Sequence, residues 1–376
     1  MRVVFPYFAQ LHQVPHSLPI AAEMALRHPD VEVHVATASL AHREFIDGML
    51  HEHAANAPLH IDALLRPWQW PWPLQDWLGV KKRTMIKNRD YLRSFDAIVV
   101  PERTSLFMRQ LGLGNTRLIW TRHGAGDRAV GFADDIDQFD FVLLAGRKIE
   151  QRLLDKGLIR PGKYLSGVYP KFDWLHNERA QKKLFNNNLP TVLYNPHFNE
   201  SLSSWEKFGL KILDIFAKND RYNLIFAPHV RLFDPPTKKK YQLFETYHGL
   251  SHIHIDLGSV RSIDMTYVQQ ADLYLGDVSS QVAEFVIRPR PCIFLNAQGA
   301  NWRGNQDYEF WNMGPVVDGL DGFYEKITST YSDHSAYVEA QRHYLKETFG
   351  ITPGESSAAR GADAIVKYLR DSCRSE

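Results

Sequence analysis

The sequence predicts an α/β fold of two doubly wound domains that face each other across a cleft. Short apolar, β-rich runs alternate with helical patterns, which is typical of a parallel sheet with helices on both faces. The alternation stops at a charged, proline-containing segment over residues 171–190 and then starts again. The length of 376 residues also fits two domains.

The first series of elements precedes residue 171 and is expected to form the first sheet. Its predicted strands are Val3–Phe5, Val31–Ala36, Ala97–Val100, Leu118–Trp120 and Phe141–Leu144. Its predicted helices are Leu18–Arg27 and Thr104–Gln110. Each strand is short and apolar, as expected for strands buried on both faces.

The second series follows the linker. Its predicted strands are Thr191–Tyr194, Asn223–Ala227, Ile253–Asp256, Leu273–Leu275 and Pro291–Leu295. Its predicted helices are Trp205–Lys218, Ser262–Gln270 and Ser280–Ile287. We therefore place domains at 1–170 and 191–350, a linker at 171–190, and a C-terminal segment at 351–376 whose helix (Ser357–Arg370) packs back on the domain junction.

Composition excludes several classes of protein. Hydrophobic residues make up 44% of the chain, charged residues 23%, and the formal net charge is +1, so nothing favours a nucleic-acid partner. There are 2 cysteines, and Cys292 lies in an apolar run, so we expect a core thiol and no disulfide. No apolar run approaches the roughly 20 residues that span a bilayer. We expect a cytoplasmic protein, with attachment to the inner face of the plasma membrane left open.

A histidine follows one predicted strand of the first series. The strand Leu118–Trp120 runs into His123-Gly124, and glycine allows a sharp turn close to a ligand. Histidine is also the side chain most easily tuned as a base near neutral pH. The alternative is a loop histidine that makes only local hydrogen bonds.

Two strands of the second series end in the same way, at a proline followed by a histidine. One ends at Asn195-Pro196-His197, and the next ends at Pro228-His229, with Arg231 close behind. Imidazole and guanidinium groups are suited to phosphate oxygens. The alternative for each segment is ordinary turn chemistry, but the repetition favours a site at the carboxyl ends of these strands.

The run from Asp277 to Phe285 follows another strand of this series. This run predicts a tight turn followed by the start of a helix. Ser279 and Ser280 lie at the helix start, and Glu284 lies one turn further along. A helix N-terminus has unpaired N–H groups that attract anions, so the serines suggest a diphosphate and Glu284 a sugar hydroxyl. The equally favoured alternative is a helix capped by Asp277 or Ser279 without any ligand.

A tryptophan-rich segment stands apart from these strand ends. It holds Trp68, Trp70, Trp72 and Trp77, and a basic run, Lys81 to Arg83, comes directly after it. Aromatic residues beside basic ones suit a membrane surface or an apolar acceptor. The alternative is a proline-rich loop whose tryptophans fill a gap between helices. No metal-ligand spacing is found, so we expect neither a metal nor a cofactor.

Together these segments resemble the CDP-glycerol glycerophosphotransferase family, enzymes that build glycerol-phosphate polymers such as teichoic acids. The resemblance spans roughly residues 115–300 and is strongest in the Asp-x-Ser-Ser-x-x-x-Glu-Phe run. It implies a GT-B fold, with His123 as the base for the acceptor hydroxyl and His229, Ser279 and Ser280 on the pyrophosphate. It also implies that Glu284 reaches the ribose or glycerol hydroxyls. The implied partners are CDP-glycerol, or a similar activated donor, and an envelope glycan or lipid acceptor.

The sequence departs from the family after the His-Gly turn. The family continues with Thr-Pro and a lysine, whereas this chain has Ala-Gly-Asp-Arg, with Arg128 as the substitute cation. The strand end Asn195-Pro196-His197 also replaces the family's Ala-Pro-Thr. Two alternatives therefore stay open: a GT-B glycosyltransferase that uses an NDP-sugar, and a nucleotide-binding protein without catalysis.

Overall fold

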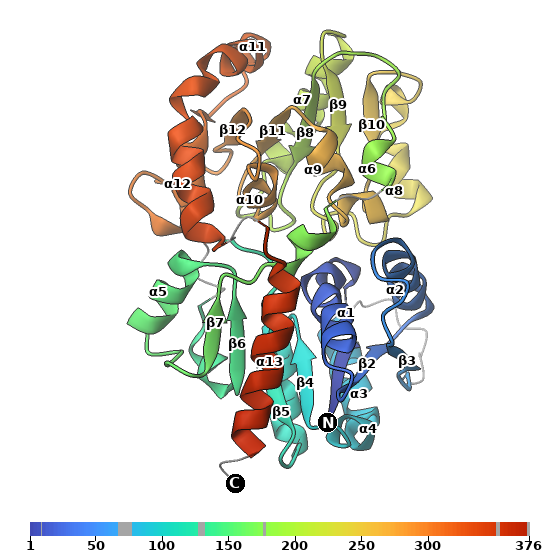
Figure 1. Ribbon diagram of the computed structural model, residues 1–376. Helices are drawn as coiled ribbons and strands as arrows, with labels where there is room; N and C mark the ends of the chain where they lie inside the picture. Colours follow the sequence, from blue (N-terminus) through green and yellow to red (C-terminus); the bar gives the residue numbers. More distant parts are fainter. Residues whose placement is uncertain (9, 67–76, 127–131, 176–177, 351–353, 374–376) are drawn as a thin grey trace. The chain divides into compact units, whose positions relative to one another are not determined.

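The computed structural model describes the chain apart from residues 9, 67–76, 127–131, 176–177, 351–353 and 374–376 (Figure 1). The chain divides into two compact units. Unit 1 comprises residues 1–124, 132–175 and 348–376, and unit 2 comprises residues 125–131 and 176–347. Each unit contains one parallel sheet with helices, so the predicted α/β class of two Rossmann-like sheets is confirmed.

Unit 1 is built on a seven-stranded sheet with the order β3-β2-β1-β4-β5-β6-β7. Its strands are β1 (Arg2–Tyr7), β2 (Glu32–Thr37), β3 (His60–Ala63), β4 (Ala97–Val100), β5 (Arg117–Trp120), β6 (Phe141–Leu144) and β7 (Tyr164–Ser166). The central strands are the ones that the sequence predicts, because they are buried on both faces. The two edge strands, β3 and β7, are half-buried and carry polar residues, so no apolar run marks them.

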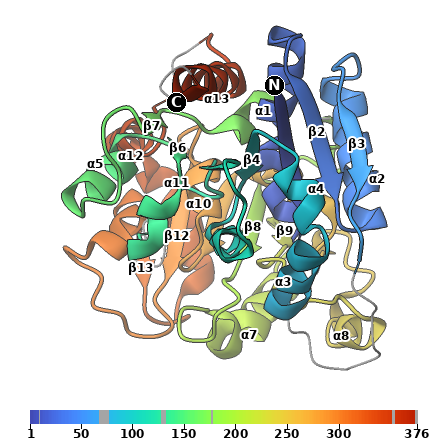
Figure 2. The ribbon, with the colours of Figure 1, turned by 90° about the horizontal axis from the view of Figure 1, so that it is seen from below.

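Helices cover both faces of this sheet, and α1 and α13 lie side by side on one of them (Figures 1 and 2). Arg27 of α1 pairs with Asp363 of α13 at 2.6 Å. The helices of unit 1 are α1 (Leu18–Arg27), α2 (Leu40–His53), α3 (Trp77–Lys87), α4 (Arg89–Arg93), α5 (Arg147–Asp155) and α13 (Ser357–Cys373). Its 3-10 helices are η1 (Leu11–His16), η2 (Arg103–Leu111), η4 (Asp134–Gln138) and η5 (Pro170–Trp174). The helix predicted at Thr104–Gln110 is thus the 3-10 helix η2.

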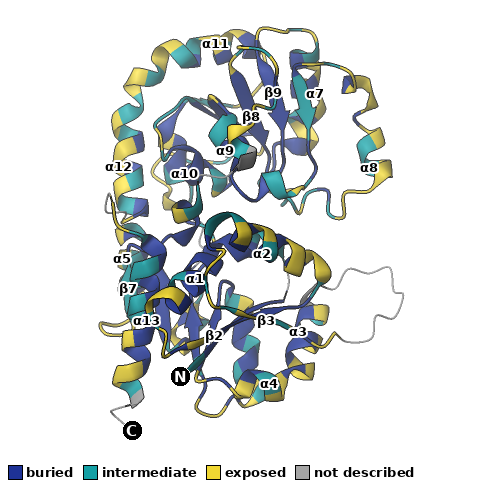
Figure 3. Cartoon of the chain, turned by 45° about the vertical axis from the view of Figure 1, so that its right-hand side comes forward, coloured by how far each residue is buried: buried dark blue, intermediate teal, exposed yellow. Residues whose placement is uncertain are grey.

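Unit 2 is built on a six-stranded sheet with the order β10-β9-β8-β11-β12-β13. Its strands are β8 (Thr191–Asn195), β9 (Asn223–Phe226), β10 (Ile253–Ile255), β11 (Leu273–Gly276), β12 (Cys292–Leu295) and β13 (Val316–Val317). Both β8 and β9 are fully buried (Figure 3), and the ring of Trp205, the first residue of α7 (Trp205–Ala217), stacks on Phe226 of β9. Cys292 is buried in β12 as predicted.

The helices of unit 2 are α6 (Glu178–Gln181), α7 (Trp205–Ala217), α8 (Lys238–Gln242), α9 (Thr266–Gln270), α10 (Gln281–Phe285), α11 (Phe323–Asp333) and α12 (Val338–Thr348). Four of the described helices of unit 2 (α6, α8, α9 and α10) have five residues or fewer. Its 3-10 helices are η6 (Glu245–Tyr247), η7 (Val260–Ser262), η8 (Gln306–Met313) and η9 (His334–Ala336). The helix expected at Ser280–Ile287 is the five-residue α10, so its dipole is smaller than the sequence suggested.

The tryptophan segment falls largely outside the described residues. Trp68, Trp70 and Trp72 lie within the segment 67–76, and Trp77 begins α3 without a described side chain. Lys81 is described, and it is buried rather than part of a basic surface. Within the described residues, every helix is too short or too polar to cross a membrane.

Candidate functional site

Each sheet has a point where the strand order reverses, and ligands in such folds bind beyond the carboxyl ends of the strands at this point. In unit 1 the reversal lies between β1 and β4, and in unit 2 it lies between β8 and β11. The predicted site residues all follow strands at or beside these two points. The two carboxyl edges are therefore the places to examine.

In unit 1, a strained turn presents His123 beyond β5. Arg122 has φ 50° and Gly124 has φ 70°, so the histidine stands between two left-handed residues. A left-handed arginine costs conformational energy, and such strain tends to occur at functional sites. The ring Nδ1 of His123 lies 2.9 Å from the carbonyl oxygen of Pro101. A carbonyl only accepts, so Nδ1 carries the proton, and in the neutral ring Nε2 keeps its lone pair.

The surroundings of His123 favour this neutral ring. Desolvation lowers the pKa of His123, although the hydrogen bond to Pro101 and the charge of Glu102 oppose the shift. The residue still keeps an exposed surface. A neutral imidazole with an unprotonated Nε2 and access to solvent has the properties of a general base.

Two further histidines lie beside His123, and our sequence analysis missed both. The ring centroids of His12 and His16 lie 5.9 and 6.3 Å from that of His123. His16 is buried, and its Nδ1 has no hydrogen-bond partner among the described residues. Burial lowers the pKa of His16 well below its usual value, and the charge of Lys171 adds to this effect. The missed signal was their position, directly after β1 at the reversal point.

A buried ion pair lies under this group of histidines. Lys81 of α3 pairs with Glu102, which follows β4, and both side chains are almost fully buried. Lys81 also donates to Thr104 Oγ1 at 2.6 Å, and Ser105 Oγ donates to Glu102 at 3.0 Å. Removing either partner would leave the other as an unpaired buried charge, so the pair stabilises the loop after β4. The Pro101 carbonyl that accepts the hydrogen bond of His123 belongs to this loop.

In unit 2, two histidines stand beyond the adjacent strands β8 and β9. The backbone N–H of Asn199 donates to His197 Nδ1 at 3.0 Å, and the N–H of Arg231 donates to His229 Nδ1 at 3.2 Å. Each Nδ1 is therefore an acceptor, so the neutral ring carries its proton on Nε2. Both rings are thus built as Nε2–H donors.

Aromatic contacts hold these two donors together. The ring centroids of His197 and His229 are 5.6 Å apart, and Phe198 lies against both, at 4.4 and 4.6 Å. The guanidinium of Arg231 lies 4.0 Å from the Phe198 ring centroid. This cation–π contact keeps a positive charge beside the histidines. The cluster is suited to an anion.

Asp277 connects the loop after β8 with the loop after β11. Its Oδ1 accepts the backbone N–H groups of His197 and Val278 at 2.9 and 2.7 Å. Its Oδ2 accepts the N–H and Oγ–H of Ser204 at 2.6 and 2.8 Å. Burial raises the pKa of Asp277 to about 6, although these hydrogen bonds oppose the shift. The side chain is therefore a carboxylate at neutral pH. Asp277 thus positions the backbone of His197, and its predicted contact with the donor stays a prediction.

Asn195 and Ser279 meet at the hydroxyl of Tyr274. Tyr274 donates to Asn195 Oδ1 at 3.2 Å, and Asn195 donates to the carbonyl of Ala227 at 2.7 Å. A hydrogen bond also links Tyr274 to Ser279. Burial raises the pKa of Tyr274 well above its usual value, and nearby carboxylates strengthen that shift, so the hydroxyl stays protonated. Neutral polar groups thus connect the ends of β8, β9 and β11.

The remaining predicted residues differ in exposure. Ser280 is exposed and precedes α10, whereas Glu284 is buried inside that helix. Gly126, which belongs to unit 2, approaches Ser280 so closely that an added Cβ would lie 3.3 Å from the serine Cβ. Arg128, the expected substitute cation, lies outside the described residues.

Several solved structures share this two-sheet architecture. A structure of the wall teichoic acid polymerase TagF with CDPG matches with a TM-score of 0.65 and 13% identity, over 99% of this chain and 89% of that one. The UDP-GlcNAc 2-epimerase from Neisseria meningitidis, bound to UDP-GlcNAc, matches with a TM-score of 0.62 and 14% identity, over 99% of this chain and 100% of that one.

The fold is that of the GT-B enzymes. A glycosyltransferase from Rickettsia africae also matches, with a TM-score of 0.51 and 14% identity, over 98% of each chain. At these identities the likeness concerns the fold alone. No protein-family model and no curated protein sequence matches the chain.

Proposed function

We propose that the protein is a transferase that moves a glycerol-phosphate, or a related polyol-phosphate, from a CDP-activated donor to an acceptor hydroxyl of an envelope polymer, glycan or lipid. CMP is the other product. The main support is the pair of Nε2–H donors, His197 and His229, beside the loop of Ser279 at the carboxyl edge of unit 2. Fixed donors at this edge are suited to a diphosphate.

On the donor side, unit 2 holds the nucleotide. His229 donates to the diphosphate, with support from His197, and Arg231 supplies a positive charge. The exposed Ser280 hydroxyl adds a further donor at the end of β11, and the Ser279 hydroxyl adds another when its proton turns from Tyr274 to the ligand. Donors fixed before the reaction stabilise the charge that grows on the leaving phosphate without reorganising. Asn195 and Asp277 hold this edge in place, and we assign the buried Glu284 to a hydroxyl of the ligand.

On the acceptor side, His123 acts as the base. The acceptor oxygen forms a bond to the β-phosphorus while the bond from that phosphorus to the bridging oxygen breaks. The electron pair of the broken bond leaves with CMP, and the acceptor proton passes to Nε2 of His123. The hydrogen bond from Nδ1 to the Pro101 carbonyl holds the ring in the required tautomer.

The acceptor is proposed to be membrane-associated, and the segment from Trp68 to Trp77 carries this part of the proposal. Co-sedimentation with anionic phospholipid vesicles tests it directly. The quadruple Trp→Ala variant at Trp68, Trp70, Trp72 and Trp77 should lose vesicle binding while keeping its affinity for the donor. Equal sedimentation of both proteins would contradict the membrane role.

A second candidate is transfer from an NDP-sugar, because structures of a UDP-sugar enzyme and a glycosyltransferase also match in fold, with TM-scores of 0.62 and 0.51 against 0.65 for the polymerase. A site for a diphosphate serves either donor, and the bond that breaks decides between them. Release of CMP indicates phosphoglycerol transfer. Release of a nucleoside diphosphate indicates glycosyl transfer.

The experiment is a thermal-shift screen followed by product analysis. CDP-glycerol, CDP-ribitol, CDP, CMP, UDP and UDP-sugars are each added to the protein, because a ligand that binds only the folded state raises Tm. We expect CDP-glycerol to give the largest shift and CMP to be released with an acceptor present. A preference for UDP-sugars would favour the second candidate, and binding without any turnover would favour a non-catalytic protein.

A further inference from the structure

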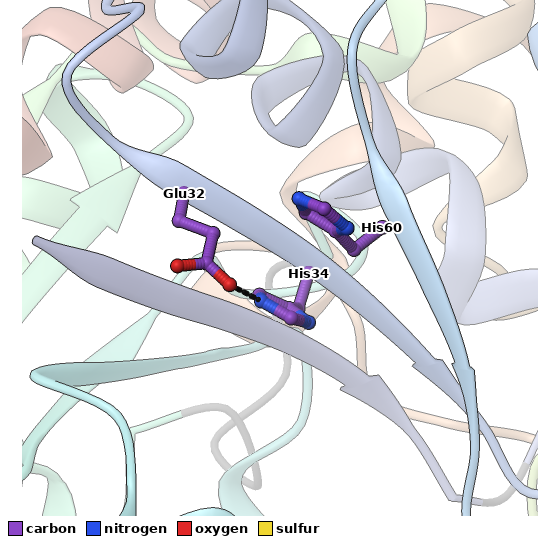
Figure 4. Close-up of side chains that lie close together, drawn as sticks. All are labelled: Glu32, His34 and His60. Atoms are coloured by element: carbon purple, nitrogen blue, oxygen red, sulfur yellow. Dashed lines mark hydrogen bonds and ion pairs between the residues drawn. The ribbon is translucent and has the colours of Figure 1, made fainter.

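A second group of polar side chains lies in unit 1, away from the carboxyl edge of the sheet. Glu32 and His60 are the first residues of β2 and β3, so this group lies at the amino ends of the strands. His34 and His60 are direct partners in the parallel pairing of β2 with β3. Because side chains alternate along a strand, Glu32, His34, His60 and Asp62 project from one face. Figure 4 shows the first three of them.

The donor atoms in this group lie close together. Glu32, His34 and His60 each offer one atom, and these atoms lie within 4.8 Å of one another. Ligands of a tetrahedral ion with bonds of about 2.1 Å lie about 3.4 Å apart. His34 Nε2 and Glu32 Oε1 are already 2.7 Å apart. Glu32 and His60 are exposed, whereas His34 is buried. The His60 ring is stacked on that of His34, with centroids 4.7 Å apart, so His60 must turn to bind the same ion.

His34 is held in the way that suits a metal ligand. Its Nδ1 lies 2.6 Å from Asp62 Oδ2, and Tyr91 donates to the same oxygen at 2.5 Å. A neutral imidazole has one N–H, so bonds to both Asp62 and Glu32 need either a second ring proton or a cation at Nε2. A metal ion between Nε2 and Glu32 takes the place of that second proton and leaves Nδ1–H to Asp62. Metal-bound histidines commonly make such a bond to an outer carboxylate.

We propose that Glu32, His34 and His60 form a binding site for a divalent transition-metal ion of the Zn²⁺ type, with Asp62 orienting His34. Two imidazoles and one carboxylate favour Zn²⁺ over Mg²⁺ or Ca²⁺, which prefer oxygen ligands. Arg2 competes for Glu32, since its Nε lies 3.4 Å from Oε2. The Oε1 atom faces His34 instead, so one carboxylate serves both partners. The bound ion would join the edge strand β3 to β2.

The test uses the untagged chain of 376 residues, treated with EDTA and passed into chelator-free buffer. Zn²⁺ is then titrated by calorimetry, and Tm is recorded with Zn²⁺, Co²⁺ and Mg²⁺. We expect one equivalent of Zn²⁺ at this site, a rise in Tm with Zn²⁺ and Co²⁺, and no comparable rise with Mg²⁺. Absence of Zn²⁺ binding, or an equal effect of Mg²⁺, would overturn the proposal.

The variants His60→Ala and Glu32→Gln change exposed side chains, so both should fold. Each is expected to weaken Zn²⁺ binding at least about tenfold, and Asp62→Asn about tenfold through the orientation of His34. His51→Ala is the matched control, because His51 is an exposed histidine of the same unit outside the group. Unchanged affinity in both His60→Ala and Glu32→Gln, or an equal loss in His51→Ala, would show that Zn²⁺ binds elsewhere. The readout needs no substrate, so it is independent of the proposed transferase activity.

Discussion

The two units use the same residue at the same kind of position but prepare it for opposite tasks. His123 in unit 1 and His229 in unit 2 each follow a strand near the point where the strand order reverses. His123 Nδ1 faces a carbonyl, whereas His229 Nδ1 faces a backbone N–H. The neutral rings therefore present a lone pair in unit 1 and a proton in unit 2. A single backbone group therefore decides whether the neutral histidine can accept a proton or donate a hydrogen bond.

The largest expected effect comes from His123→Asn. The asparagine amide can keep the bond to the Pro101 carbonyl but has no counterpart of the Nε2 lone pair. We expect kcat to fall by about 10²–10⁴-fold, the usual contribution of a general base, with Tm and donor affinity nearly unchanged. Steady-state kinetics and calorimetry measure the three quantities. Near wild-type turnover would remove His123 from the role of base.

Asp277→Ala should have the next largest effect, on stability rather than on chemistry. The change leaves the buried donors of His197, Val278 and Ser204 without their acceptor. Unsatisfied buried donors cost about 1–3 kcal/mol each, so we expect a loss of at least about 3 kcal/mol in the free energy of unfolding. Urea denaturation measures this loss, with the exposed Asp220→Asn as control. Equal stability of the two variants would contradict the positioning role of Asp277.

A pair of substitutions at His229 tests the proton-donor side of the comparison. Glutamine can place an amide N–H near the position of Nε2, whereas asparagine cannot reach it. We expect His229→Asn to lower kcat/KM by about 10²-fold, and His229→Gln to lose clearly less. Equal losses in both variants would mean that the Nε2 proton is not what the site uses.

The pH dependence of activity should give the smallest effect. The base must be neutral, and the pKa of His123 is lowered from 6.5, so kcat/KM should fall only as the pH drops below 6.5. Burial raises the pKa of Asp277 to about 6, so donor affinity must be measured in parallel over the same pH range. Loss of activity centred above pH 6.5, at constant donor affinity, would contradict a desolvated neutral base.

Buried strands were predictable from the sequence, because burial on both faces leaves an uninterrupted apolar run. Ala97–Val100 and Phe141–Leu144 match β4 and β6 in full. The edge strands β3 and β7 lack such runs. The length of α10 was overestimated, since apolar residues continue past Phe285 although the helix ends there.

The candidate site was predictable only where a strand led directly into a polar residue. His123, His197 and His229 were found in this way. His12 and His16 lie in η1, a few residues beyond the end of β1, so no strand leads directly into them, and they approach His123 only after the chain has folded. The tautomers of these histidines could not be predicted from the sequence either, because each depends on a single backbone contact that the turn geometry decides.

The position of α13 has a consequence for the order in which the protein is made. Unit 1 contains segments from both ends of this chain. Arg27 pairs with Asp363, and Asp30 pairs with Arg370. A ribosome produces the whole of unit 2 before it reaches residue 357. Until then, the face of the first sheet that α13 covers stays open, and unit 1 lacks part of its core. Unit 2 can therefore finish folding first, although it comes second in the sequence.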